Sequence, residues 1–167
     1  HTSGCIGINA LGKNKNAGVI YPLQTMILGH ELYLTKAPFL IEASDSETLK
    51  RLAELSACVS EDIHVVISED RETLHMAAVM VNNFTNHLVA TAKTILEEHG
   101  LDWKLLLPLL QETSQKLKYL DPEKAQTGPA IRGDQKTIEK HLSKLAKSEQ
   151  QLYQLFTKRI ANHTKES

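Results

Sequence analysis

Residues 68–100 constrain the fold of this 167-residue chain more than any other stretch, because their pattern is helical throughout. Acidic residues occupy the first turn, and Gly100 is a typical helix stop signal. At 1.5 Å per residue, the stretch predicts a helix of roughly 45 Å. Its apolar residues lie on more than one face, which is typical of the central rod of a helical bundle or of a dimer interface.

The part before this helix predicts a small mixed α/β unit. Strands are expected at residues 18–26, where Pro22 marks an edge or a strand end, and at residues 37–44 and 62–70. Between the last two, Ser44 and Glu47 form an S-x-x-E capping box for an amphipathic helix. Strand, helix and strand within about 30 residues form a βαβ pattern, which indicates parallel pairing.

The part after it predicts further helices. Residues 102–120 form one, with a kink or restart at Pro108. A loop at 121–134 follows, and Asp134 is placed to cap the next helix. Ser148 and Gln151 form an S-x-x-Q cap for the last one. The expected fold is an α/β fragment, residues 1–69, followed by an all-α domain built on one long central helix, residues 70–167.

One narrow stripe of the long helix is polar. With about 100° of rotation per residue, Asn82, Asn86 and Lys93 all lie within about 20° of His75. Asn83 lies about 80° round from His75, on the neighbouring side. Asparagine is a poor helix former, so three asparagines within the five residues 82–86 need an explanation. Two interpretations stay open: a solvated polar face, or polar contacts inside a cleft, to which His and Asn are suited.

The run TGPAIRGD, residues 127–134, is a second candidate. Thr127 and Arg132 are its substrate-binding candidates, because the planar guanidinium can bind a carboxylate or a phosphate. The alternative is a purely structural connection between two helices.

Several classes of function are not expected. His75, His87 and His99 are 12 residues apart, so each points about 120° from the last and no shared metal site is expected. The net charge of −1 gives no reason to expect nucleic-acid or membrane binding, and no apolar run approaches a membrane span. There is no G-x-G-x-x-G or P-loop phosphate cradle, and no nucleophile with a base at local spacing. Cys5 and Cys58 are expected to be reduced thiols in a cytoplasmic protein.

Six runs occur in the order HTSG, GVIYPLQTM, PFLIEAS, LHMAAVMVNNFTNH, LLPLLQETSQKL and AQTGPAIRGD. In this combination the chain resembles the later part of a family of Rossmann-type NAD(P)-dependent oxidoreductase-like proteins. The helical C-terminal domain of that family has no known function and is similar to those of 6-phosphogluconate dehydrogenase and pyrroline-5-carboxylate reductase. The resemblance implies that about a hundred residues, which hold the cofactor phosphates, precede this chain in its relatives.

The resemblance also implies a site. His1, Thr2 and Ser3 would lie at the carboxyl end of a sheet strand, near the nicotinamide of NADP or NAD, with Pro22 and Gln24 beside them. His75 and Asn83 match the family pattern H-x-A-A-x-x-x-x-N-F. His75 takes the position at which the related dehydrogenases carry a lysine, so proton transfer and substrate orientation are the expected roles of His75 and Asn83. Helical spacing favours Asn82 and Asn86, instead of Asn83, as the partners of His75 on one stripe. All three remain candidate site residues.

The leading hypothesis is therefore the C-terminal portion of an NAD(P)-dependent oxidoreductase. It would act on a small carbonyl, imine or hydroxy compound and would form a homodimer. The alternatives are a non-catalytic helical dimerisation module and a small-molecule sensor that uses the cleft without chemistry.

Overall fold

The computed structural model describes residues 1–29 and 34–166, and these form two compact units, residues 1–87 and 88–167. The boundary between these two units falls between residues 87 and 88.

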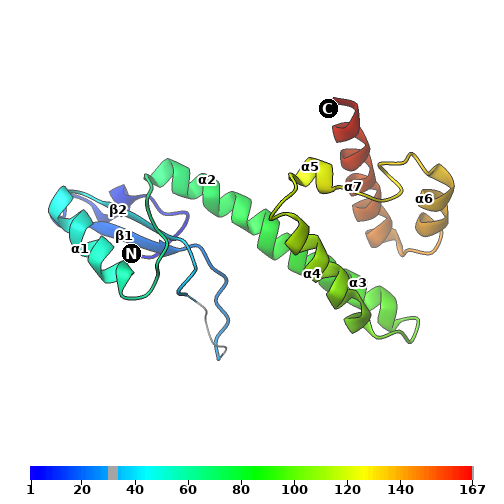
Figure 1. Ribbon diagram of the computed structural model, residues 1–167, viewed down its shortest axis with the longest axis horizontal. Coiled ribbons are helices and arrows are strands. Elements are labelled where there is room, and N and C mark those ends of the chain that lie inside the picture. The colour runs from blue at the N-terminus through cyan, green and yellow to red at the C-terminus, as the bar shows by residue number, and fades with distance from the viewer. Residues whose placement is uncertain (30–33, 167) are drawn as a thin grey trace. The chain divides into compact units, whose positions relative to one another are not determined.

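The first unit contains a three-stranded sheet of order β1-β2-β3 (Figure 1). Strand β1 (Gly18–Pro22) pairs antiparallel with β2 (Phe39–Ala43), which pairs parallel with β3 (Ile63–Val65). Helix α1 (Ser46–Ala57) connects β2 to β3, so the predicted βαβ unit is confirmed. The antiparallel β1 was not expected, and Pro22 ends it as predicted.

The core of this unit lies on both faces of the sheet, and α1 packs on one of them. Val19 and Ile41 are fully buried, and Phe39 and Leu40 are nearly so. Burial of each such side chain stabilises the fold by about 1.5–3 kcal/mol. Helix α1 packs closely because Gly18 has no side chain: a Cβ there would lie 2.4 Å from Cδ1 of Leu52.

The predicted cap of α1 was wrong by one residue. Asp45 caps the helix, and its Oδ1 accepts a hydrogen bond from the Thr48 amide at 2.8 Å. The Ser44 hydroxyl instead accepts from the Ala17 amide at 3.1 Å and so holds the chain before β1 against the end of β2. A carboxylate is the stronger acceptor for an amide at a helix N-terminus, which favours Asp45.

The helical stretch after β3 consists of three consecutive segments. Helix α2 (Ser68–Ala78) is followed by a π-helical segment, η2 (Val79–Phe84), and then by α3 (Thr85–Glu97). The prediction of one regular helix was therefore incomplete. A π-helical turn closes with i→i+5 hydrogen bonds, so it holds more residues than an α-helical turn and changes which side chains share a face.

The second unit is helical in every element assigned to it. After α3 come a 3₁₀ turn, η3 (Trp103–Leu106), and α4 (Leu107–Lys116), which carries Pro108 in its first turn; the predicted restart is confirmed. A short α5 (Pro122–Ala125) lies inside the predicted loop.

Two further helices complete the second unit. Helix α6 (Gln135–Leu142) is capped by Asp134 as predicted, at 3.1 Å from the Thr137 amide. Helix α7 (Lys147–Glu166) begins one residue before Ser148, so the predicted S-x-x-Q cap was wrong. The Ser148 hydroxyl donates to Glu149 instead.

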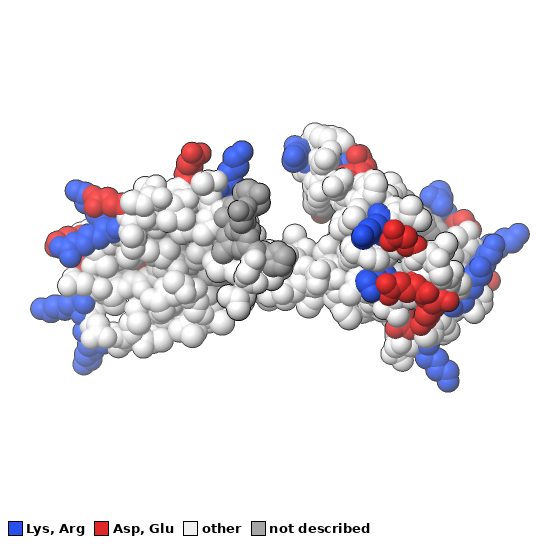
Figure 2. Space-filling model, turned by 90° about the horizontal axis from the view of Figure 1, so that it is seen from below, with Lys and Arg blue, Asp and Glu red and all other residues white. Residues whose placement is uncertain are grey.

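Among the residues that the structure covers, no helix is long and apolar enough to cross a membrane. Basic and acidic side chains are both present on the face seen in Figure 2, where neither sign covers a broad region.

Candidate functional site

A pocket of about 530 Å³ lies within the first unit, beside β1, α2 and η2. Its walls are partly apolar, with Leu23, Leu74 and Ala78 among them. Six polar side chains also line it: Tyr21, Gln24, Thr25, His75, Asn82 and Asn83. An apolar pocket with a few convergent polar groups is the usual form of a small-molecule site.

The π-helical segment explains why two neighbouring asparagines line the same pocket as His75. Neighbours on an α-helix point about 100° apart, whereas the wider turn of η2 lets both Asn82 and Asn83 contribute to one wall. The prediction that Asn82 and Asn86 share a face with His75 assumed about 100° of rotation per residue throughout. The π-helical segment η2 changes that rotation before Asn86. Asn86 is not among the residues that line the pocket.

The centre of the polar group is a pair formed by Tyr21 and His75. The Tyr21 hydroxyl lies 2.9 Å from Nδ1 of His75, and the two rings meet edge to face with centroids 5.8 Å apart. Sequence analysis missed Tyr21, which lies 54 residues from His75 in a strand whose partner was not predicted. Its only sequence signal was its place next to Pro22 at the end of a strand.

The surroundings of Tyr21 favour its protonated form. Burial, and secondarily the Cys5 thiol, raise the pKa of Tyr21 above its ordinary value of 10.0, so the hydroxyl keeps its proton near neutral pH. It can then donate to Nδ1 of a neutral His75, which leaves the proton of the imidazole on Nε2. Nε2 has no hydrogen bond from the described residues and is not among their buried unpaired atoms, so it is accessible to solvent.

The predicted HTSG segment reaches this pair through its glycine. Gly4 is buried, and a Cβ there would lie 2.7 Å from Nδ1 of His75 and 2.8 Å from Cζ of Tyr21. Only a residue without a side chain allows this approach. The His1 amino group donates to the Gly18 carbonyl, and the Ile20 amide donates to the His1 carbonyl. This is the hydrogen-bond pattern of a parallel strand beside β1.

The other residues of this segment have local partners. Ser3 donates its amide to Nδ1 of His1 and accepts the amide of Cys5 on its hydroxyl, while Thr2 is exposed. Nε2 of His1 is buried without a hydrogen-bond partner in the described part of the chain. None of His1, Thr2 and Ser3 lines the pocket; of the cofactor-binding candidates, Gln24 does and Pro22 does not.

A buried ion pair fixes the helix that carries His75. Arg71, one turn before His75, is fully buried and donates to Glu42 of β2 at 2.5 Å and to the Ile6 carbonyl at 2.8 Å. Burial raises the pKa of Glu42, but hydrogen bonds from Arg71 and Ser68 outweigh it and hold that pKa below its ordinary value. Arg71 thereby joins β2, α2 and the segment that contains Gly4.

The remaining candidates lie elsewhere. Lys93 pairs with Glu97 at 2.6 Å on an exposed helix face. Thr127 and Arg132 belong to the second unit, where Thr127 lines a separate pocket and Arg132 is exposed. Within the described ranges, no group of three His, Cys, Asp or Glu residues could hold a metal ion.

The fold matches two solved structures. One is a Bacteroides fragilis protein, BF3122, provisionally described as an NADP oxidoreductase: it is 39% identical, with a TM-score of 0.92 over 97% of this chain. This chain spans 64% of the length of that protein, so the similarity in fold concerns only that part of it. The other is TM1727 from Thermotoga maritima, 24% identical, with a TM-score of 0.76 over 99% of this chain and 68% of that one.

A search among curated proteins found no match. The comparison with protein families found one over residues 37–160, described as a domain of unknown function, DUF2520. This stretch includes β2, η2, α3 and most of the second unit. The chain therefore belongs to the DUF2520 family.

Proposed function

We propose that this chain forms the substrate-facing part of an NADP- or NAD-dependent oxidoreductase that acts on a small carbonyl, imine or hydroxy compound. The observation that carries the proposal is the hydrogen-bonded Tyr21–His75 pair, which lines a pocket together with two carboxamides. The description of the Bacteroides relative supports it. Because this chain spans 64% of that relative, the activity of the whole protein is part of the proposal.

We expect the pocket to hold the nicotinamide end of the cofactor. Gln24 supplies an amide that can pair with the carboxamide of the ring, and Leu23 and Ala78 supply apolar surface for the ring itself. When bound, the nicotinamide would supply or accept the hydride. No G-x-G-x-x-G turn occurs in the chain, so we expect the phosphates to be held by residues outside it.

His75 would move the proton that accompanies the hydride. In the reducing direction, Nε2 gives its proton to the oxygen or nitrogen of the substrate as that atom becomes negative. In the oxidising direction, Nε2 takes the proton back. A second proton moves with the first so that the imidazole stays neutral: the Tyr21 hydroxyl gives its proton to Nδ1 when Nε2 gives one to the substrate, and takes it back in the reverse step.

Asn82 and Asn83 would orient the substrate, because each carboxamide can donate to and accept from a carbonyl or hydroxyl group. Asn86, Thr127 and Arg132 remain predicted substrate contacts, Arg132 for an acidic group. A relationship of the helical part to 6-phosphogluconate dehydrogenase and pyrroline-5-carboxylate reductase is also part of this proposal.

The test is NADPH- and NADH-linked turnover by the whole protein, over a panel of small carbonyl and imine compounds. His75→Gln should lower kcat by at least about 10²-fold, the usual contribution of a general acid or base. Asn83→Ala should lower kcat/KM about tenfold, as for one lost hydrogen bond, while Asn162→Ala, at an exposed helical asparagine outside the pocket, serves as the matched control. Full turnover by His75→Gln, or calorimetry that shows no binding of either dinucleotide, would contradict the proposal.

A second candidate, self-association, is compatible with the first. Met76, Met80 and Phe84 follow one another at four-residue intervals on α2 and η2 and are 62%, 61% and 54% exposed. Exposed apolar patches on a folded chain mark interaction surfaces, and we propose that a second copy covers this one. Sedimentation should show a dimer that Met80→Glu dissociates and that Met26→Glu, at an exposed methionine outside this face, leaves intact.

A further inference from the structure

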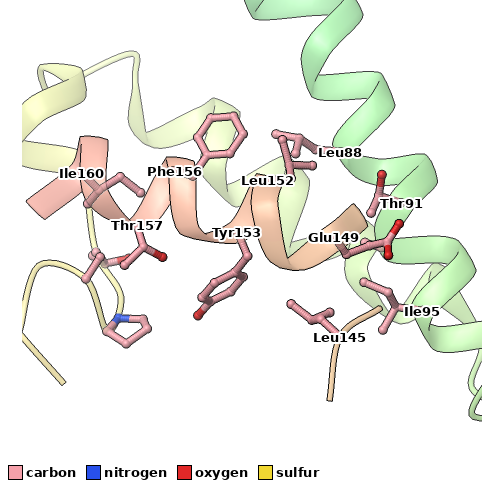
Figure 3. A pocket seen from close by; sticks show the side chains of 14 residues that line it. Leu88, Thr91, Ile95, Leu145, Glu149, Leu152, Tyr153, Phe156, Thr157 and Ile160 are labelled. Carbon is pink, nitrogen blue, oxygen red and sulfur yellow. The ribbon is translucent and has the colours of Figure 1, made fainter. Parts of the chain in front are cut away.

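The second unit contains a pocket of its own, of about 350 Å³, to which the proposed oxidoreductase chemistry assigns no role. It lies between α3, α7 and the loop that contains Thr127 and Pro129 (Figure 3). All of its lining residues belong to residues 88–160, so the pocket depends on this unit alone. Its volume lies in the range of about 300–1,000 Å³ that is usual for small-molecule sites.

The pocket is long and mostly apolar. Glu149, Leu152, Phe156 and Ile160 line it from one face of α7, and the last lies eleven residues after the first, or about 16 Å along the helix. Figure 3 shows Glu149 near one end and Ile160 near the other, with Leu152 and Phe156 between them. Leu88 and Phe156 are 37% and 41% exposed, so this chain leaves apolar surface in the pocket uncovered.

The pocket has one charged side chain among its described lining residues, and it lies at one end of the pocket. Among the described lining residues, Glu149 is the only one that is ionised at neutral pH. Hydrogen bonds from the Ser148 hydroxyl and from its own backbone hold the pKa of Glu149 below its ordinary value. No ion pair involves Glu149 in the described chain. The N-terminus of α7 carries about half a positive charge, which the full charge of the carboxylate outweighs.

We infer that this pocket binds a small elongated amine, with its apolar body along Leu152 and Phe156 and its protonated nitrogen at Glu149. An apolar body would cover the exposed surface of Leu88 and Phe156, and the cation would give Glu149 the counter-charge that the chain itself does not supply. A purely apolar occupant, such as a side chain of a second copy, would cover the apolar surface but would leave Glu149 without a counter-charge.

The test compares two probes of almost the same shape, 4-phenylbutylamine and 4-phenylbutyrate, which differ in the sign of their charge. Calorimetry on the whole 167-residue chain should show the amine binding at least tenfold more tightly than the carboxylate. Glu149→Gln should reduce that preference to threefold or less. Glu139→Gln, which removes an exposed carboxylate of α6 outside the pocket, should leave it unchanged.

A second variant tests the place of binding. Ala92→Phe puts a ring into the pocket from α3, and it should abolish amine binding while circular dichroism shows the helices intact. Equal affinity for the two probes, a preference for the carboxylate, or an unchanged preference in Glu149→Gln would overturn the inference. So would a lack of amine binding under conditions where sedimentation shows self-association that Ala92→Phe disrupts, because a second copy would then be the occupant.

Discussion

The hydroxyl of Tyr21 is the one hydrogen-bond partner of the His75 imidazole in the described chain. Tyr21→Phe removes it with almost no change in shape, so Nδ1 loses its donor and the imidazole loses its fixed tautomer. We expect a loss of about 0.5–1.5 kcal/mol in unfolding free energy and a clear shift of the Nδ1 resonance in nitrogen NMR. Tyr153→Phe is the matched control, because it breaks a tyrosine–histidine pair with His141 in the second unit. An unshifted His75 resonance in Tyr21→Phe would show that the pair does not form.

At the same scale, Gly4 sets how closely the first residues approach the pair. A methyl group there would be 2.7 Å from Nδ1 of His75, closer than van der Waals contact allows. Gly4→Ala should therefore cost about 1–3 kcal/mol and displace the imidazole, as measured by denaturant unfolding and by the same NMR resonance. Gly7→Ala is the control, because its Cβ would meet only Ser68 at 3.5 Å. Equal stability of the two variants would contradict the close approach.

At the scale of elements, the Glu42–Arg71 pair joins β2 to α2 and gives stability a pH dependence. The pKa of Glu42 is below its ordinary value of 4.5 in the folded state, so its contribution is complete above about pH 4.5. That contribution is lost as the pH falls through the lower folded pKa. Glu42→Gln leaves Arg71 buried without a counter-charge and should cost about 3–5 kcal/mol at pH 7.

The measurement for this pair is the unfolding free energy of both proteins between pH 7 and pH 2.5. The difference between wild type and Glu42→Gln should narrow toward the acidic end. Glu47→Gln, which breaks the exposed pair with Arg51, should cost less than about 1 kcal/mol. A pH-independent difference for Glu42→Gln would argue for packing, and against charge, as the cause of the loss.

The elements also show what sequence can predict. The restart at Pro108, the cap at Asp134 and the βαβ unit were predicted correctly, whereas the caps at Ser44 and Ser148 were not. The η2 segment was not predicted, because apolar spacing over two turns fits α- and π-helical periods about equally well. The cap at Asp45 was missed because Ser44 also fits a capping motif, and the contact of Ser44 with Ala17 is long-range.

At the scale of the whole molecule, the candidate site shows more clearly what could not be predicted from the sequence. His75, Asn82 and Asn83 were found from helical geometry and resemblance, since all three lie on one stretch of sequence. Tyr21 and Gly4 were not assigned to His75, because they reach it only through the folding of β1 and the first residues onto α2. A site assembled across 54 residues leaves no trace in local spacing.

The central claim is that Nε2 of His75 faces a bound substrate and nicotinamide. The most direct test is a titration of the whole protein with NADP⁺, followed through the imidazole nitrogen resonances of His75. The account predicts a saturable shift of Nε2, from the positive ring beside it, while Nδ1 keeps its hydrogen bond to Tyr21. A titration that reaches saturation and leaves Nε2 unmoved would contradict the account.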